Sequence, residues 1–555
     1  MKASDFIVDE IHNQGINKVF GYIGGMVAHL VDSIYKNPNV EMINTINEQG
    51  AGFAAEGLAK VNSVPSVAIA TSGPGATNLI TSIADCYFDS VPVLFITGQV
   101  NTYEYKKYNI KQSGFQETNI VDMVKPITKY STMITDVSNL KYEIQKAFYI
   151  TQTGRKGPVL LDIPMDIQSA EINLDELHSF VKPDNDVLNS QKNINLQNIL
   201  MTAKKPLILL GNGIKLSNAV GVLNDFLAEK EIPVVQSLLG VGVVPYEYSY
   251  NAGFIGTYGN RYGNIALSEC DLLLVLGSRL DIRQTGSNID LFKSKTIIHV
   301  DIDINELQSD KFDKIIIHSD IKDFLSMIKN ARFSDISEWK NRIIKLKKLY
   351  STKSKNFSIP NIFLEKVWDY SQENDIFLAD VGQNQMWVAQ SAKIKNNQKF
   401  ITSGGHGSMG FALPASIGTS FQNRSIVITG DGGVQMNIQE LEIIKRRNLP
   451  IKIIVMNNSN LGMVRTFQEL YFGGRYPSTV WDYSAPDFAL IAKSYGIVSK
   501  TFNIENITDE DIKAFMSDNE PTLINILMPT NTQVEPRLQF GNPINMQHPI
   551  IEEAQ

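Results

Sequence analysis

The sequence predicts an α/β protein of three domains, each built around a parallel sheet covered by helices. The chain has 555 residues, which is more than one domain usually holds and suits three. Short apolar runs rich in β-branched residues recur along the whole chain, as is typical of strands buried on both faces of a parallel sheet. Helical stretches separate these runs, and this alternation is the pattern of right-handed crossover units.

The expected strands lie in all three thirds of the chain: VAIAT (67–71), VPVLFITG (91–98), KPLILLGNG (205–213), DLLLVLGS (271–278), KTIIHVDID (295–303), RSIVITGDG (424–432) and IKIIVMNN (451–458). Two polar stretches, near 181–193 and 347–360, are expected to link domains. They divide the chain into a first domain over 1–180, a second over 190–345 and a third over 360–555. The tail from Pro529 is rich in Asn, Pro and Gln, so we expect it to be irregular and to cross the surface.

Composition excludes several classes of protein. Apolar residues make up 43% and charged residues 20% of the chain, which is ordinary for a globular protein. The net charge of −7, without a Lys/Arg-rich face, argues against a nucleic-acid partner. Cys86 and Cys270 are far apart and form neither a disulfide framework nor a zinc motif. No segment is typical of a secretion signal or membrane span, so we expect a cytoplasmic protein without a membrane partner.

Two polar side chains follow neighbouring expected strands in the last third. Asp431 ends one strand within a Gly-Asp-Gly turn, a helix is expected near 438–447, and Asn458 ends the next strand. The carboxyl ends of parallel strands share one sheet edge, where ligands bind. The oxygens of Asp431 and Asn458 suit Mg²⁺, and Gly430 and Gly432 allow backbone amides to approach a diphosphate. The alternative is a tight strand–helix turn with a capping Asp, unrelated to the Asn pair.

The spacing GDG-x(24)-NN is similar to the fingerprint of thiamine-diphosphate enzymes. This resemblance implies that Mg²⁺ is bound by Asp431, the side chain of Asn458 and the backbone carbonyl of Asn460.

The whole sequence resembles the acetolactate synthase family. The motifs that carry the resemblance are GYIGG (21–25), NEQGAGFAAEGLAK (47–60), TSGPGATNLITS (71–82), SGFQETNIV (113–121), PITKY (126–130), DVGQNQMW (380–387) and TSGGHGSMGFALPASIG (402–418). Glu48 falls on the glutamate that activates the cofactor in this family, although on its own it also suits the first turn of a helix. A carboxyl group in an apolar site shares a proton readily with the aminopyrimidine ring. The resemblance places Gln116, Lys129 and Phe115 with Glu48 in the catalytic group.

The resemblance further implies a thiamine-diphosphate site shared by the first and third domains. Its expected residues are Gly24, Gly25, Pro74, Asn78, Gly382, Gln383, Asn384, Gln385, Gly407, Met409, Gly430, Asp431, Gly432, Gly433, Asn458, Leu461, Gly462, Met463 and Val464. In this family the two domains meet across a subunit interface, so a homodimer or homotetramer is expected. A regulatory small subunit is a further partner that the resemblance raises.

The middle third resembles the flavin domain of the same family. Its motifs are GNG (211–213), SLLGVG (237–242), IGTYGNRYG (255–263), GSRLDIRQTG (277–286) and HVDID (299–303). The implied FAD contacts are Gly211, Gly213, Leu239, Gly256, Tyr258, Gly277, Arg279, Asp281, Arg283, Asp301, Ile302 and Asp320. Arg279 and Arg283 would pair with the flavin diphosphate. The alternative is a domain that keeps its shape without flavin; the retained motif favours FAD in a structural role.

The activity that the resemblance implies is a decarboxylating carboligation. Pyruvate loses CO₂ on the cofactor, and the remaining two-carbon unit is transferred to a second 2-oxo acid. Phe467 stands where the family usually has a Trp that selects a larger acceptor, and His406 replaces a more usual Leu. The acceptor could therefore be a keto-sugar nucleotide or another carbonyl compound.

Other activities would suit the same cofactor. A simple pyruvate decarboxylase or a flavin-dependent pyruvate oxidase would use the same expected cofactors. A regulatory protein without activity is disfavoured because Glu48, Asp431 and Asn458 are all present.

Overall fold

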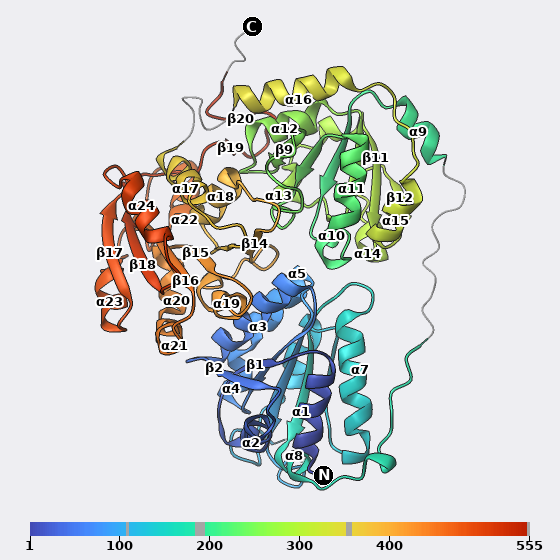
Figure 1. Cartoon of the computed structure of the whole chain (residues 1–555), viewed down its shortest axis with the longest axis vertical. Coiled ribbons are helices and arrows are strands. Elements are labelled where there is room, and N and C mark those ends of the chain that lie inside the picture. Colours follow the sequence, from blue (N-terminus) through green and yellow to red (C-terminus); the bar gives the residue numbers. More distant parts are fainter. Residues whose placement is uncertain (107–109, 184–194, 351–357, 552–555) are drawn as a thin grey trace.

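Three six-stranded parallel sheets form the centres of three layered α/β units (Figure 1). This computed structural model describes residues 1–106, 110–183, 195–350 and 358–551. The predicted fold class is confirmed. Most of the predicted linker near 181–193 lies outside the described residues. The second predicted linker overlaps two helices, because α16 continues to Leu349 and α17 begins at Ile359.

The first unit has the strand order β2-β1-β3-β4-β6-β5. Its strands are β1 (Lys18–Tyr22), β2 (Glu41–Asn44), β3 (Ser66–Ala70), β4 (Val93–Gln99), β5 (Tyr130–Met133) and β6 (Val159–Pro164). Its helices are α1 (Ala3–Asn13), α2 (Ala28–Lys36), α3 (Glu48–Asn62), α4 (Pro74–Asn78), α5 (Ile80–Asp89), α6 (Ile120–Val124), α7 (Leu140–Gln152) and α8 (Met165–Ser169). Helix α3 begins at Glu48 because the Asn47 side chain accepts a hydrogen bond from the Gln49 N–H at 2.8 Å.

The middle unit has the order β12-β11-β10-β7-β8-β9. Its strands are β7 (Pro206–Leu210), β8 (Val234–Gln236), β9 (Asn251–Phe254), β10 (Leu272–Leu276), β11 (Thr296–Asp301) and β12 (Ile315–His318). Its helices are α9 (Leu196–Thr202), α10 (Gly213–Leu216), α11 (Val220–Lys230), α12 (Arg261–Glu269), α13 (Ile282–Thr285), α14 (Ile304–Leu307), α15 (Ile321–Ile328) and α16 (Ser337–Leu349). Strand β10 is wholly buried at the centre of this sheet.

The third unit has the order β14-β13-β15-β16-β18-β17. Its strands are β13 (Ile376–Ala379), β14 (Lys399–Thr402), β15 (Ser425–Gly430), β16 (Ile451–Asn457), β17 (Val498–Asn503) and β18 (Thr522–Leu527). Its helices are α17 (Ile359–Asp369), α18 (Gln383–Ser391), α19 (Ala412–Thr419), α20 (Asp431–Met436), α21 (Leu441–Arg446), α22 (Gly462–Tyr471), α23 (Phe488–Ser494) and α24 (Asp509–Met516). The helix expected near 438–447 is shorter, because α20 starts directly at Asp431 and a 3₁₀ turn precedes α21.

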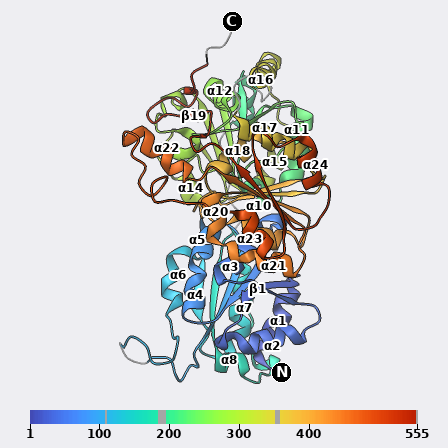
Figure 2. The same cartoon turned by 90° about the vertical axis from the view of Figure 1, so that its left-hand side faces the viewer.

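Helices α3 and α5 lie on the side of the first unit that faces the other two (Figures 1 and 2). Helix α3 packs against α19 of the third unit with little space between the two backbones. A Cβ added at Gly57 would overlap the Ala415 carbonyl oxygen, and one at Gly418 would overlap the Ala54 carbonyl oxygen. Small residues on α3 therefore allow the first and third units to meet closely.

The C-terminal tail crosses the middle unit, as expected. Its strands within the described residues 529–551 are one short antiparallel pair, β19 (Arg537–Leu538) with β20 (Gln547–His548). The Leu538 N–H donates to the Thr257 carbonyl at 2.7 Å, and the Gln547 side chain donates to the Gly259 carbonyl at 2.9 Å. Among the described residues, no helix is both long enough and apolar enough to span a membrane.

Candidate active site

Asp431 and Asn458 lie at the same edge of the third sheet. Strands β15 and β16 pair in parallel with Gly430 opposite Met456, so both chains leave the sheet at the same level. Both side chains are buried. The Asp431 carboxylate accepts a hydrogen bond from the Tyr483 hydroxyl at 2.9 Å, and burial raises the pKa of Asp431 to about 6. The Gly-Asp-Gly turn and the Asn pair therefore place two side chains with oxygen atoms at one edge of the sheet.

Asn460 adds a third polar group to this edge. Its side-chain NH₂ donates to the carbonyls of Asn458 at 2.7 Å and Thr530 at 2.8 Å. Its side-chain Oδ1 is buried and has no hydrogen-bond partner. A buried oxygen without a donor is costly unless a cation or ligand satisfies it. The group therefore suits an ion that prefers oxygen ligands.

Glycines make a cradle beside these residues. A Cβ added at Gly432 would lie 2.6 Å from Leu461 Cδ2 and 3.2 Å from Met409 Cε. A Cβ at Gly462 would overlap the side-chain oxygen of Gln383. Only glycine leaves room for backbone and side chains to approach this closely. Loops that follow β13, β14, β15 and β16 therefore converge on one place.

The start of α18 faces this cradle with buried amide side chains. Gln383 accepts a hydrogen bond from the Asn458 side chain at 2.8 Å. Asn384 donates to the Asp380 carbonyl at 2.7 Å, and Gln385 donates to the Thr402 hydroxyl at 2.6 Å. These bonds fix the first turn of α18, whose free N–H groups can bind a phosphate.

The remaining candidates for the cofactor site are divided between two units. The third unit holds Gly382 before α18, Gly407 between β14 and α19, Gly433 in α20, and Met463 and Val464 in the first turn of α22. The first unit holds Gly24 and Gly25 after β1, and Pro74 and Asn78 at the two ends of α4.

Glu48 belongs to a separate group in the first unit. Its buried carboxylate accepts a hydrogen bond from the Asn78 side chain at 3.0 Å. The nearby loop holds Gln116 in a left-handed conformation, with φ of +63°, which is strained for a residue other than glycine. Phe115 beside it has 79% of its surface exposed. Strain and an exposed aromatic ring at one loop are typical of a ligand-binding region.

The Glu48 and Asp431 groups belong to different units of the chain. Among the described residues, no hydrogen bond or ion pair joins them. The third unit instead places Glu440 against the start of α3, where its carboxylate accepts the Ile46 N–H at 3.2 Å. Burial raises the pKa of Glu440 to about 7. Glu440, which the sequence did not single out, thus occupies the contact between the two units in this chain.

Both groups leave large apolar side chains exposed around them. Tyr22 and Ile23 are exposed near the Glu48 group, and Val464, Phe467 and Tyr471 are exposed on α22. Phe467 packs against Tyr471, with ring centroids 4.6 Å apart. Exposed apolar surface of this kind marks a binding or association face.

Lys129 lies in the first unit, away from the Asp431 group. Its ammonium donates to the carbonyls of Ile150 and Thr153 at the C-terminal end of α7. Burial lowers the pKa of Lys129 to about 8. The lysine therefore holds the segment that follows α7, which lines the cavity described next.

A cavity of about 260 Å³ lies where the three units meet. Ten of the expected flavin contacts line it: Gly213, Leu239, Tyr258, Gly277, Arg279, Asp281, Arg283, Asp301, Ile302 and Asp320. The other two, Gly211 and Gly256, lie behind the wall, where an added Cβ would overlap the carbonyl oxygens of Gly277 and Arg283. Arg279 lies 3.6 Å from Asp281 and stays partly exposed. Sequence motifs in the middle third thus converge on one cavity.

Several cavity residues come from the other two units and carried no local signal. The first unit contributes Phe88 and Arg155, and the third contributes Met386. Arg155 pairs with Asp303 at 3.0 Å. His406 stacks on Phe88 with parallel rings 5.4 Å apart, so the unusual histidine packs beside the cavity.

Comparison with known proteins finds three domain models along the chain. Three family models match in order: "Thiamine pyrophosphate enzyme, N-terminal TPP binding domain" over residues 1–123, the central domain over 195–328, and the C-terminal TPP binding domain over 380–526. The acetolactate synthase large subunit of Lactococcus lactis subsp. lactis is 36% identical, with 97% of this chain and 94% of the relative covered. The acetolactate synthase isozyme 2 large subunit of Escherichia coli K12 is 34% identical, with 98% of each chain covered.

The chain belongs to the acetolactate synthase large-subunit family. More distant members of the family include the chloroplastic acetolactate synthase of Arabidopsis thaliana, which is 32% identical over 98% of this chain. As a member of the acetolactate synthase family, the chain is a thiamine-diphosphate-dependent enzyme. The two TPP binding domains contain the Glu48 and Asp431 groups, respectively. The predicted family and enzyme class are confirmed.

Proposed function

We propose that this chain is the catalytic subunit of a carboligase that takes a two-carbon unit from pyruvate and transfers it to a second 2-oxo acid. The main observation in support is the Asp431 group, in which buried oxygens and a glycine cradle converge at one sheet edge. Further support comes from the names of the relatives, which are acetolactate synthases from bacteria and plants.

Mg²⁺ and the cofactor diphosphate would bind at the Asp431 group. Asp431, Asn458 and Asn460 would supply oxygens to the ion, and the diphosphate would complete its octahedral shell. The fit is supported by the partnerless, buried Oδ1 of Asn460 and by the raised pKa of Asp431, which a nearby cation would lower.

When bound, thiamine diphosphate supplies the carbon nucleophile and the electron sink for decarboxylation. Glu48 would hold a proton at the aminopyrimidine ring, and Asn78 would keep the Glu48 carboxyl in place. Met409 would support the cofactor from below, while Gln116 and Phe467 would contact the substrates. Exclusion of water by the apolar side chains of Met409 and Phe467 would protect the reacting carbon from protonation.

The complete site would form across a homodimer, with pairing into a tetramer as a further step. Support comes from the two groups lying in different units, with no hydrogen bond or ion pair between them among the described residues. The apolar surface exposed around both groups is further support. A second copy related by a two-fold axis would place the Glu48 group of each subunit against the Asp431 group of its partner, which gives two equivalent sites. The relatives are named large subunits, which implies a small regulatory subunit as a partner.

FAD would occupy the cavity between the three units. Arg279 and Arg283 would pair with its diphosphate, and the glycines around Gly277 would allow close approach of the backbone. Because carboligation has no net redox step, the flavin would stabilise the structure rather than transfer electrons.

The proposal is tested by supplying the purified protein with pyruvate, thiamine diphosphate and Mg²⁺. We expect CO₂ release and an acetohydroxy acid that yields acetoin after acid treatment. A Glu48→Gln variant should bind the cofactor but lose at least about 100-fold in turnover, since proton transfer contributes this much. Absence of CO₂ release from pyruvate would contradict the proposal; CO₂ release with product only from a keto-sugar acceptor would revise the acceptor alone.

A further inference from the structure

We propose that Asp85 and Asp89 of α5 are positioning residues that couple the three-unit cavity to the thiamine cradle through the loop 402–409. This inference rests on the proposed function, because it takes the cavity to hold FAD and the cradle to hold thiamine diphosphate. It concerns two residues to which neither the motifs nor the reaction assigned a role. The loop 402–409 is the physical connection, since Gly404 lines the cavity and Met409 lies in the cradle.

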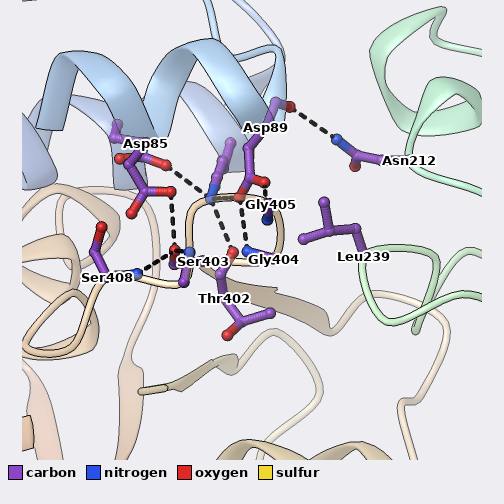
Figure 3. A network of polar contacts seen from close by, with 12 residues as sticks. Asp85, Asp89, Asn212, Leu239, Thr402, Ser403, Gly404, Gly405 and Ser408 are labelled. Carbon is purple, nitrogen blue, oxygen red and sulfur yellow. Dashed lines mark hydrogen bonds and ion pairs between the residues drawn. The ribbon is translucent and has the colours of Figure 1, made fainter. Parts of the chain in front are cut away.

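Asp89 holds the cavity end of this loop (Figure 3). Its buried carboxylate accepts the N–H of Gly404 at 3.0 Å and the N–H of Gly405 at 2.6 Å. Lys60 of α3 lies 2.7 Å from the same carboxylate and donates to the Thr402 carbonyl at 2.8 Å. Asp89 itself also lines the cavity. A ligand in the cavity would therefore contact both the loop and the residue that holds it.

Asp85 holds the cradle end of the loop. It lies one helical turn before Asp89 on α5 and accepts a hydrogen bond from the Ser403 hydroxyl at 2.9 Å. The Ser403 oxygen in turn accepts the N–H of Gly407 and the N–H of Ser408, each at 3.0 Å. The next residue is Met409, which touches the glycine cradle. One helix thus fixes both ends of the loop.

The middle unit closes the connection from the other side. The Asn212 side chain donates to the Asp89 carbonyl at 3.4 Å, and the Leu239 side chain packs against Gly404, 2.6 Å from the position of an added Cβ. Figure 3 shows Asn212 next to Asp89, and Leu239 next to Gly404 of the loop. Both residues line the cavity. A flavin bound there would contact the middle unit, Asp89 of α5 and Gly404 of the loop at the same time.

Burial makes these contacts strong and sensitive to charge. Glu56, Asp85 and Asp89 lie around the single ammonium of Lys60. Burial raises the pKa of Glu56 well above its usual range and that of Asp85 to about 7. Although burial opposes it, the carboxylates of Asp89 and Glu56 raise the pKa of Lys60. Hydrogen bonds to a charged, buried acceptor are stronger than neutral ones, so loss of the Asp89 charge should loosen the loop.

The test measures the affinity of the full-length protein for thiamine diphosphate with Mg²⁺ by calorimetry, before and after saturation with FAD. In the wild-type protein we expect FAD to tighten thiamine diphosphate binding about tenfold, and thiamine diphosphate to tighten FAD binding by the same factor. In Asp89→Asn this factor should fall below about twofold, while each ligand still binds. Ser403→Ala, which removes one hydroxyl and little volume, should lower the factor in the same direction.

Lys399→Met is the matched control. Lys399 also joins the third unit to α3, by donating to the Val61 carbonyl at 2.6 Å, but it does not touch the loop. We expect this variant to keep the tenfold factor even if its stability falls. An unchanged factor in both Asp89→Asn and Ser403→Ala would overturn the inference. FAD binding that leaves thiamine diphosphate affinity unchanged in the wild type would overturn it alone, whereas absence of FAD binding would overturn it together with the flavin part of the proposed function.

Discussion

Buried carboxyl groups occur where the units of this chain are fixed to each other or to ligands. Asp162 of β6 is also buried, but it lies inside the first unit, on the strand next to the edge of its sheet. It accepts hydrogen bonds from the Thr97 hydroxyl at 2.7 Å and the Gln99 amide at 2.9 Å, yet burial raises its pKa to about 7. The folded protein therefore keeps a proton that the unfolded chain loses above about pH 4.

This proton predicts how stability depends on pH. Between about pH 4 and pH 7 the folded state binds one proton more at Asp162, so the free energy of unfolding falls as pH rises, by roughly 4 kcal/mol in total. Asp162→Asn should remove this contribution, and denaturant unfolding of both proteins across that range measures it. An equal slope in wild-type and variant proteins would show that Asp162 does not hold the proton.

The contact between α3 and α19 is the element on which the first and third units depend. Its closeness comes from glycine, since a Cβ at Gly418 would overlap the Ala54 carbonyl oxygen. Gly418→Ala should therefore separate the helices and lower the free energy of unfolding by about 2 kcal/mol or more, as overpacking does. Chemical unfolding provides the measurement.

Gly221 of α11 is the control for this substitution. It is exposed and helical, and an added Cβ would meet no atom within 4 Å. Gly221→Ala should stabilise the protein by about 0.5–1 kcal/mol, because alanine has the lower entropy cost in a helix. If both substitutions changed the free energy of unfolding in the same direction, the close contact of α3 with α19 would not explain the effect at Gly418.

At the scale of the whole molecule, the separated Glu48 and Asp431 groups predict complementation between defective subunits. Glu48→Gln and Asp431→Asn should each be inactive alone. In a mixed dimer one site carries both substitutions and the other carries neither, so co-expression should restore about one quarter of wild-type activity after random pairing. A mixture that stays inactive, although the mixed dimer is isolated by two affinity tags, would place the site within one chain.

Local sequence was enough to predict the parts of the site that lie on neighbouring strands. Asp431 and Asn458 were expected together because β15 and β16 are consecutive and pair directly. The flavin motifs of the middle third were likewise predicted, since they follow strands of one sheet. Glu440 and Phe88 were not singled out, because a glutamate near a helix start and an aromatic in the last turn of a helix have many ordinary structural roles.

The sequence alone determined the three parallel sheets and the family, and it predicted that Asp431 and Asn458 lie at one sheet edge. Buried strands need continuous apolar runs, and their carboxyl ends need glycine and polar residues, so both leave a local pattern. Only the tertiary structure decided which distant segments contact each other: α5 and the loop 402–409 are in contact although more than 300 residues separate them in the sequence. Such contacts depend on how the units dock, and docking leaves no periodic signal in the chain.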